Sequence, residues 1–231
     1  KKLNAIIQRE QDSVDNMAQQ VALAGKNKST NEKTMTLEDA LGIRIEHTDA
    51  ADVEKIKKLM GDKADKFVKA FRVVNVHTQK RFDDHKEKKS FKPWTKLLWH
   101  GSRNENWLSI LNKGLMIRPT GVVITGAMFG NGVYFANKAQ KSIGYTSLSG
   151  SYWANGRESQ AFLALYEVNT GMEYRTKVRE GWMGGCDEKT LKSKGDYDSL
   201  YAEGGADLRN DEFIVYNQNQ STIKYIIEIK N

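Results

Sequence analysis

The 231-residue sequence contains one cysteine, Cys186. A single cysteine cannot form an internal disulfide, which excludes the framework of a small disulfide-rich secreted protein. No cluster of Cys and His residues has metal-ligand spacing, so no metal site is expected. No apolar run approaches the roughly 20 residues of a membrane helix, and the charged start of the chain is unlike a secretory signal. These absences favour an intracellular protein, in the cytoplasm or in a eukaryotic nucleus, without a membrane partner.

The length and composition predict one folded domain with an N-terminal extension. Apolar residues make up 39% of the chain and charged residues 28%, as in ordinary globular proteins. Residues 1–24 have helical composition, and 25–36 are polar without a period, which is typical of a linker. We therefore expect an N-terminal helix and linker over 1–36 and one catalytic-sized domain over 37–231.

The positive charge is concentrated in one segment. The net charge is +7, and residues 55–92 carry thirteen Lys or Arg against five Asp or Glu, a local surplus of eight. Such a segment could bind nucleic acid or another polyanion. The alternative is a solvated helix face, which we favour because the lysines alternate with core-type residues.

Local patterns predict many short strands and few helices. Helices are expected after an Asp49 or Asp52 cap up to Gly61, after Asn104 or Asn106 up to Gly114, and after an Asn137 cap. Strands are predicted over 71–78, 96–100, 133–136, 161–168, 174–178, 212–216 and 225–230. Residues 79–90 and 217–222 are expected to be loops or turns, and 181–210 a long excursion. The pattern indicates an α+β fold with split, mostly antiparallel sheets and a few flanking helices.

Residues 97–145 carry the side chains needed to hold a flat heteroaromatic ring. Gly101 follows the histidine that ends a strand, and its bare backbone permits close approach to a ligand. Ser142 adds a hydroxyl. Tyr145 and Tyr134 are expected to stack on the two sides of the ring, and His100 to hydrogen-bond a ribose hydroxyl.

If the ring is bound to a sugar and is cleaved from it, the sugar becomes cationic, and a nearby carboxylate would stabilise that charge. The C-terminal part of the chain is expected to supply this carboxylate. Glu212 is the best-placed candidate, and the adjacent Asp211 is its rival. Glu212 shares a strand face with Ile214 and Tyr216, which makes its burial plausible. Cys186 has no basic neighbour in sequence, so we interpret it as incidental rather than nucleophilic.

Four segments, in this order, resemble motifs of the catalytic domain of the poly(ADP-ribose) polymerases, which cleave NAD and transfer ADP-ribose. The segments are 97–103 (Leu-Leu-Trp-His-Gly-Ser-Arg), 128–136 (Met-Phe-Gly-Asn-Gly-Val-Tyr-Phe-Ala), 141–145 (Lys-Ser-Ile-Gly-Tyr) and 211–216 (Asp-Glu-Phe-Ile-Val-Tyr). The strong likeness covers about residues 97–145 and 211–228, and a weaker one extends back to about Leu41.

The resemblance implies roles for individual residues. His100, Tyr134 and Glu212 are similar to the family's His-Tyr-Glu triad, in which they would contact the adenine-side ribose, the nicotinamide, and the nicotinamide ribose with the acceptor hydroxyl. Glutamate at the third position is the form associated with chain elongation. The implied NAD-binding residues are Gly101, Ser102, Arg103, Asn106, Phe135, Ala136, Lys141, Ser142 and Tyr145. Gly101 and Ser142 would hold the carboxamide.

The resemblance implies an ADP-ribosyltransferase-like fold and an NAD-dependent enzyme. NAD⁺ would be the co-substrate, nicotinamide the released product, and a protein, the chain itself or poly(ADP-ribose) the acceptor. One alternative is a catalytically silent NAD or ADP-ribose binding module, because Met116 and Ala127 stand where the family usually has an arginine and an aromatic residue. The other is a nucleic-acid-binding module that uses residues 55–92.

Overall fold

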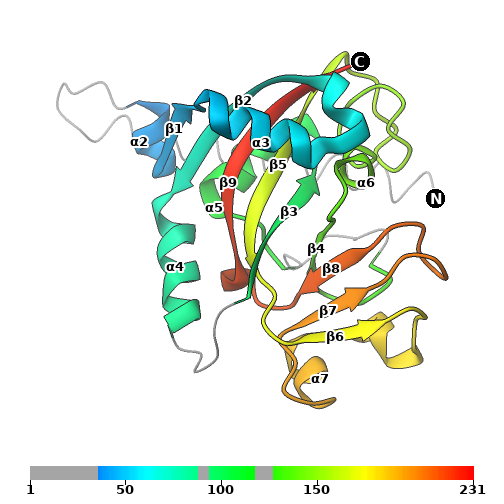
Figure 1. Cartoon of the computed structure of the whole chain (residues 1–231). Helices are drawn as coiled ribbons and strands as arrows, with labels where there is room; N and C mark the ends of the chain where they lie inside the picture. Colours follow the sequence, from blue (N-terminus) through cyan, green and yellow to red (C-terminus); the bar gives the residue numbers. More distant parts are fainter. Residues whose placement is uncertain (1–35, 88–93, 118–126) are drawn as a thin grey trace.

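The computed structural model describes residues 36–87, 94–117 and 127–231, which build two β-sheets (Figure 1). The larger sheet has the strand order β1-β2-β9-β5-β3, and every neighbouring pair in it is antiparallel. Its strands are β1 (Ile43–His47), β2 (Phe67–Asn75), β9 (Ser221–Lys230), β5 (Gln160–Asn169) and β3 (Thr95–Gly101).

The smaller sheet has the order β4-β8-β7-β6 and is antiparallel except for the parallel pair of β6 and β7. Its strands are β4 (Val133–Phe135), β8 (Glu212–Val215), β7 (Ser199–Ala202) and β6 (Glu173–Thr176). The predicted α+β fold with split, mostly antiparallel sheets is therefore confirmed.

Short helices flank the sheets, and α3 (Ala50–Met60) crosses one face of the larger sheet (Figure 1). The Asp49 carboxylate caps α3 by accepting a hydrogen bond of 2.7 Å from the Asp52 amide, and Gly61 ends it, as predicted. The other α-helices are α2 (Leu37–Leu41), α4 (Val76–Glu87), α5 (Trp107–Lys113), α6 (Ala139–Ile143) and α7 (Glu188–Lys192). The 3₁₀ turns are η1 (Gly61–Lys66), η2 (Asn104–Asn106), η3 (Gly181–Gly185) and η4 (Gln218–Gln220).

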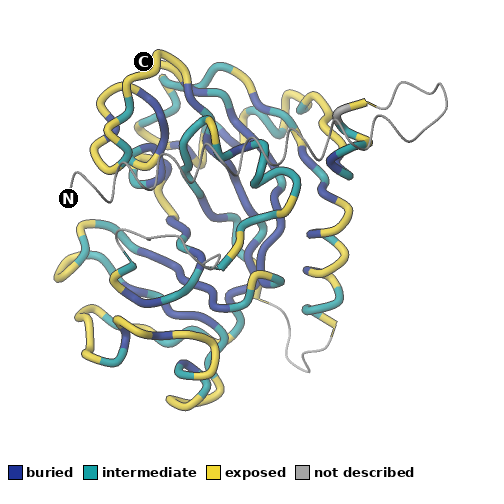
Figure 2. The backbone as a smooth tube through the Cα atoms, turned by 180° about the vertical axis from the view of Figure 1, so that it is seen from behind, coloured by how far each residue is buried: buried dark blue, intermediate teal, exposed yellow. Residues whose placement is uncertain are grey.

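The central strands are buried along most of their length (Figure 2). Successive side chains of a strand point to opposite faces of the sheet, and both faces are covered. In β5, Leu163 and Leu165 pack in the core beneath α3, while Ala164 and Tyr166 pack in a second core that includes residues of the smaller sheet. A third core lies on the other face of the smaller sheet and includes Cys186. The near-continuous apolar run of β5 follows from this two-sided burial.

The loop or hairpin turn predicted over 79–90 is wrong as far as the described residues go, because 76–87 form α4. Its start is capped by Asn75, whose side-chain oxygen accepts hydrogen bonds from the amides of His77 and Thr78. The helix buries only a narrow stripe, including the fully buried Phe82. Its mostly polar surface explains why the sequence looked like a loop.

Other local predictions need correction. Asn137 does not cap α6, because its side chain donates to Asp211 at 2.7 Å and Lys138 occupies the cap position. The predicted excursion over 181–210 contains η3, α7 and β7, and the edge strand β1 was not anticipated. The predicted turn over 217–222 ends at Ser221, where β9 begins. The helix and linker predicted over 1–36 lie almost wholly outside the described residues.

The two sheets meet where β3 passes the end of β4. The amide of Trp99 donates to the carbonyl of Ala136 at 2.7 Å, and the Ala136 amide donates back to Trp99 at 3.0 Å. These paired hydrogen bonds fix the end of β3, with His100 and Gly101, against the motif around Tyr134.

Candidate active site

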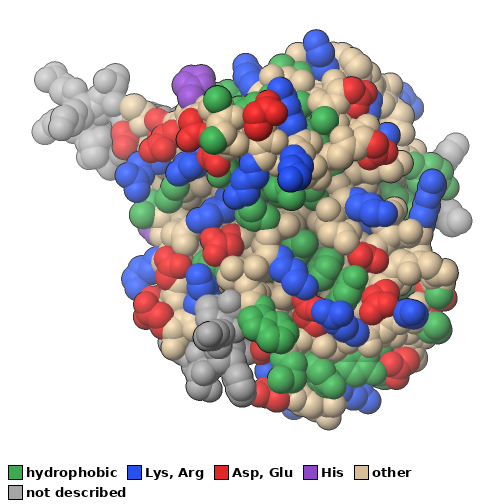
Figure 3. Space-filling view, in the orientation of Figure 1, with side chains coloured by type: hydrophobic (Ala, Val, Ile, Leu, Met, Phe, Trp, Pro, Cys, Tyr) green, Lys and Arg blue, Asp and Glu red, His purple; other side chains and the backbone are tan. Residues whose placement is uncertain are grey.

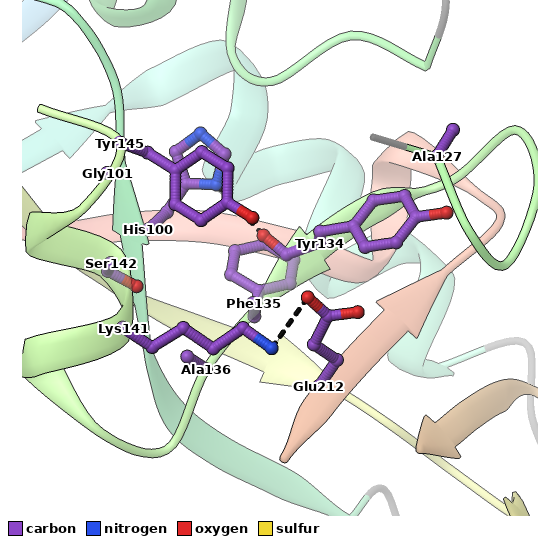
Figure 4. A pocket seen from close by; sticks show the side chains of 10 residues that line it. All are labelled: His100, Gly101, Ala127, Tyr134, Phe135, Ala136, Lys141, Ser142, Tyr145 and Glu212. Atoms are coloured by element: carbon purple, nitrogen blue, oxygen red, sulfur yellow. Dashed lines mark hydrogen bonds and ion pairs between the residues drawn. The ribbon is translucent and has the colours of Figure 1, made fainter. Parts of the chain in front are cut away.

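A cavity of about 140 Å³ lies beside this junction (Figure 4). Most of its lining comes from β3, β4, α6 and the start of β8, and β3 and β8 are more than a hundred residues apart in the chain. The lining residues are His100, Gly101, Ala127, Tyr134, Phe135, Ala136, Lys141, Ser142, Tyr145 and Glu212. The fold thus brings together nine of the residues singled out in the sequence, and Ala127 completes the wall.

A hydrogen bond to its ring fixes the orientation of the His100 side chain, and burial keeps the ring neutral. Its Nδ1 lies 3.0 Å from the carbonyl oxygen of Tyr134, which can only accept, so Nδ1 carries the proton. Burial lowers the pKa of His100, although the hydrogen bond to Tyr134 acts in the opposite direction. The neutral ring leaves Nε2 free to accept a hydrogen bond from a ligand hydroxyl.

Gly101 allows β3 and α6 to approach each other closely. A Cβ built on Gly101 would lie 1.9 Å from the carbonyl oxygen of Ser142, a distance that no real side chain tolerates. The residue is therefore glycine for a steric reason, independent of any ligand. The approach also brings the buried Ser142 to the cavity wall beside the Gly101 backbone.

The ring of Tyr134 forms one wall of the cavity, and its hydroxyl both donates and accepts a hydrogen bond. It donates to the carbonyl of Gly130 at 2.9 Å and accepts from the amide of Phe129 at 3.0 Å. Gly130 has φ of +84°, and a Cβ there would lie 2.4 Å from the Cys186 amide nitrogen. Burial raises the pKa of the Tyr134 hydroxyl, so this ring stays uncharged at neutral pH.

Tyr145 lies just beyond the end of α6, on the other side of the cavity opening (Figure 4). Burial raises the pKa of its hydroxyl to about 12, and the nearby charge of Glu212 adds to the shift. The Tyr145 side chain is nevertheless 38% exposed, so the ring borders the cavity without closing it.

Glu212 and Lys141 form a buried ion pair at the cavity (Figure 4). Lys141 Nζ lies 2.6 Å from Glu212 Oε1, and the two side chains are only 13% and 11% exposed. Lys141 Nζ also donates to the carbonyl of Asn210 at 3.2 Å. The pair holds a carboxylate beside a pocket with aromatic walls, where electrostatic effects are strong because water is largely excluded.

The rival carboxylate, Asp211, is occupied with structural bonds. It accepts from the Tyr201 hydroxyl at 2.9 Å, from the Asn137 side-chain amide at 2.7 Å and from the Gly204 amide at 2.8 Å. Burial would raise the pKa of Asp211, but these hydrogen bonds outweigh burial and lower it. Asp211 does not line the cavity, whereas Glu212 does.

Three residues of the predicted NAD-binding set do not line the cavity: Ser102, Arg103 and Asn106. The Asn106 side chain donates to Ser102 Oγ at 3.0 Å. Arg103 is partly exposed, and its Nη1 lies 3.9 Å from Glu105 Oε1. Asn106 occupies the cap position of α5 without a side-chain capping bond, so its amide serves Ser102 instead.

A wider groove of about 1100 Å³ continues from the cavity, and sequence reasoning missed it. The two share Ala127, Lys141, Tyr145 and Glu212, so a molecule in the groove has direct access to the carboxylate. Additional groove residues include Lys66, Met128, Tyr152, Trp153, Arg179 and Arg209. The only sign of this groove in the sequence was an adjacent Tyr-Trp pair in a glycine-punctuated loop.

Part of the basic surplus in residues 55–92 is neutralised by acids that lie outside the segment. Arg72 pairs with Asp52 at 2.6 Å, and Lys69 pairs with Glu228 at 3.3 Å. Further ion pairs join Lys57 to Glu54, Lys63 to Asp62, Lys80 to Asp84 and Lys86 to Glu167. Blue and red side chains alternate over the face that carries α3 and α4 (Figure 3). This mixed surface is a poor template for a polyanion.

Two further observations concern the described residues. Within 36–87, 94–117 and 127–231, no group of three or more His, Cys, Asp or Glu side chains is arranged to hold a metal ion. In the same part of the chain, no helix has both the length and the apolar character needed to cross a membrane.

Comparison with known proteins places these features in context. The family model "Poly(ADP-ribose) polymerase catalytic domain" matches residues 47–231. The poly(ADP-ribose) polymerase-like protein 100L of Invertebrate iridescent virus 6 is 36% identical over 176 residues, which cover 73% of this chain and 90% of the viral protein. Human poly(ADP-ribose) polymerase 2 is 33% identical over 159 residues, 58% of this chain and 26% of the human protein. Zebrafish (Danio rerio) poly(ADP-ribose) polymerase 1 is 31% identical over 158 residues, 60% of this chain and 15% of its own length.

Proposed function

Because the chain belongs to the family of poly(ADP-ribose) polymerase catalytic domains, which use NAD⁺ as co-substrate, we propose that it transfers ADP-ribose to a protein and then extends the product into a chain. One observation carries the proposal: the Glu212 carboxylate is held 2.6 Å from Lys141 beside a cavity with tyrosine walls. A larger groove opens from the same carboxylate and leaves room for an acceptor.

The cavity suits the nicotinamide end of NAD⁺. The ring is a flat cation, which aromatic faces attract, and Tyr134 and Tyr145 present such faces to one space. The Gly101 backbone and the Ser142 hydroxyl supply polar partners for the carboxamide. His100, with Nε2 unprotonated, accepts a hydrogen bond from a ribose hydroxyl.

The reaction then follows from where the charges lie. The bond between ribose C1′ and the nicotinamide nitrogen breaks, and its electron pair leaves with the nicotinamide, which becomes neutral. The sugar carries positive charge in the transition state, and the Glu212 carboxylate lies beside it. An acceptor hydroxyl, polarised by Glu212, forms the new bond to C1′ and releases its proton to water. Lys141 keeps the carboxylate in position through their ion pair.

The test uses NAD⁺ labelled in the adenylate part. The wild-type chain is expected to release nicotinamide and to give a ladder of labelled products on a gel. Glu212→Gln is expected to reduce chain extension at least 100-fold, because removing a preorganised transition-state charge costs about 3 kcal/mol. Glu203→Gln is the matched control, since Glu203 directly follows strand β7 of the same sheet and does not line the cavity. A single labelled product without a ladder would exclude elongation, and the absence of nicotinamide release would exclude transfer.

A second candidate is a module that binds NAD or ADP-ribose without turnover. It is favoured by Ala127, which lines the cavity at a position where relatives are expected to carry an aromatic residue. Calorimetry separates the two functions. Binding of NAD⁺ with no nicotinamide release supports the silent module, whereas turnover excludes it.

A further inference from the structure

The two tyrosine walls of the cavity are held by different means. The Tyr134 hydroxyl has two backbone partners, the amide of Phe129 and the carbonyl of Gly130. Among the described residues, no hydrogen bond holds the hydroxyl of Tyr145. Its ring is also partly exposed, at 38%. The orientation of Tyr145 must therefore come from packing against neighbouring side chains.

The aromatic neighbour of Tyr145 is Trp153. The two ring centroids lie 6.1 Å apart with an interplanar angle of 15°, an offset-stacked arrangement. Trp153 lines the outer groove and not the cavity, while Tyr145 lines both. Tyr145 thus has the ring pocket on one side and Trp153 on the other.

The loop that carries Trp153 is tied to the end of α6. The amides of Trp153 and Ala154 both donate to the carbonyl of Gly144, at 3.0 and 3.3 Å. Ser151 Oγ donates to the carbonyl of Ile143 at 2.8 Å. A Cβ on Gly144 would lie 3.3 Å from Trp153 Cδ1, so the indole packs closely over this backbone. The loop and the helix end therefore hold one another in place.

Trp153 contributes little to the core, because 63% of its surface is exposed. Truncating it would open no buried cavity. A purely structural role for Trp153 therefore predicts almost no consequence for the remote pocket.

We propose that Trp153 is a positioning residue for the ring that binds in the cavity: it braces Tyr145 from the groove side so that Tyr145 can stack on a flat heteroaromatic ring. Only the identity of that ring, nicotinamide, rests on the proposed function. The bracing itself follows from the ring geometry and from the loop anchored on Gly144. The brace replaces for Tyr145 what two hydrogen bonds do for Tyr134.

The test is direct binding of nicotinamide to the whole chain, measured by calorimetry. Trp153→Ala is expected to weaken binding about three- to tenfold, the range of one aromatic pair. Trp153→Phe keeps a stacking ring and is expected to stay within about twofold of wild type. Trp94→Ala is the matched control, because Trp94 is 61% exposed and lines neither the cavity nor the groove. It is expected to bind nicotinamide as wild type does.

Kinetics provide the second readout. Loss of a brace on the bound ring raises KM for NAD⁺ more than it lowers kcat, because the interaction is already made in the ground state. Thermal melting checks that the variants fold. If Trp153→Ala melts early, Trp153→Leu retains apolar bulk without a stacking face and should show the same weakened binding.

The outcomes separate this inference from the proposed function. Equal binding by wild type and Trp153→Ala overturns the brace, as does equal loss in the Ala and Phe variants or no nicotinamide binding by wild type. Turnover of NAD⁺ by Trp153→Ala with wild-type KM leaves the proposed function intact and removes the inference. If the wild type binds nicotinamide but does not turn over NAD⁺, and Trp153→Ala weakens that binding, the inference stands and the proposed function is removed.

Discussion

Lys141 Nζ lies 2.6 Å from Glu212 Oε1, with both side chains nearly buried. The two residues are 71 positions apart in the chain, one on α6 and the other at the start of β8. Their ion pair joins α6, which lines the cavity, to the strand that supplies the carboxylate. A buried pair of this kind is costly to break from one side, because the remaining charge is left without a partner.

Lys141→Met is therefore expected to lower the free energy of unfolding by about 3 kcal/mol, since the Glu212 charge stays buried and unpaired. The double variant Lys141→Met with Glu212→Gln removes both charges and should recover part of this loss. Denaturant unfolding of the wild type, the two single variants and the double variant measures the coupling free energy between the two side chains. Strictly additive losses would show that the two side chains do not interact in solution.

The two tyrosine hydroxyls are expected to differ in their contribution to stability. Tyr134→Phe leaves the Phe129 amide and the Gly130 carbonyl without their partner, which costs about 2 kcal/mol and lowers Tm by about 4–8 °C. Tyr145→Phe removes a hydroxyl that has no hydrogen bond among the described residues, so Tm should change by less than about 2 °C. Calorimetric melting compares the two. The reverse order of effects would contradict the hydrogen-bonding pattern of the loop at Phe129.

Gly101→Ala is expected to damage both the fold and the pocket. The added methyl group would overlap the carbonyl of Ser142, so β3 and α6 must separate, at a cost of about 3 kcal/mol. Nicotinamide binding should fall below detection. Gly185→Ala is the control, because a Cβ there meets nothing within 4 Å, and its stability should change by no more than about 0.5 kcal/mol. Urea unfolding and calorimetry test both statements, and a Gly101→Ala variant that binds normally would refute the close approach.

Asp211 should make stability depend on pH. Its pKa is lowered in the folded chain, because hydrogen bonds outweigh the opposing effect of burial. The unfolded chain therefore binds more protons in acid, and the stabilisation from Asp211 is present above its ordinary pKa of roughly 3.9. It is lost as pH falls through the folded-state pKa.

The corresponding measurement is Tm between pH 7 and pH 2.5 for wild type and Asp211→Asn. The variant should melt earlier at pH 7, and the difference should shrink below about pH 4. Asp65→Asn, at an exposed position, is expected to show no such difference. A gap that stays constant across the range would mean that the charge of Asp211 does not stabilise the fold.

Local sequence patterns were reliable where the side chains have one dominant environment. The helix after Asp49 and the strands with apolar alternation were predicted because burial and periodicity agree there. The alternation of 212–216 also predicted the burial of Glu212, and that residue is 8% exposed. Its chemical role remains a prediction.

Patterns failed where distant contacts decide the structure. Helix α4 is polar on most of its surface and depends on its capping by Asn75 and on the packing of Phe82. The Asn137 side chain was expected to cap a helix but bonds Asp211, 74 residues away. The lysine surplus was interpreted as a solvated face with a polyanion site as the alternative, and the acids that pair with Lys69 and Arg72 could not be identified because they lie outside the segment.

The sequence by itself determined the fold class, most strands, and most of the residues that line the cavity. Tertiary structure alone decided that Asp211 is occupied by structural hydrogen bonds and that Trp153 stacks on Tyr145. The reason is physical. Periodicity and capping act over a few residues, whereas these contacts depend on how separate strands and loops converge in space.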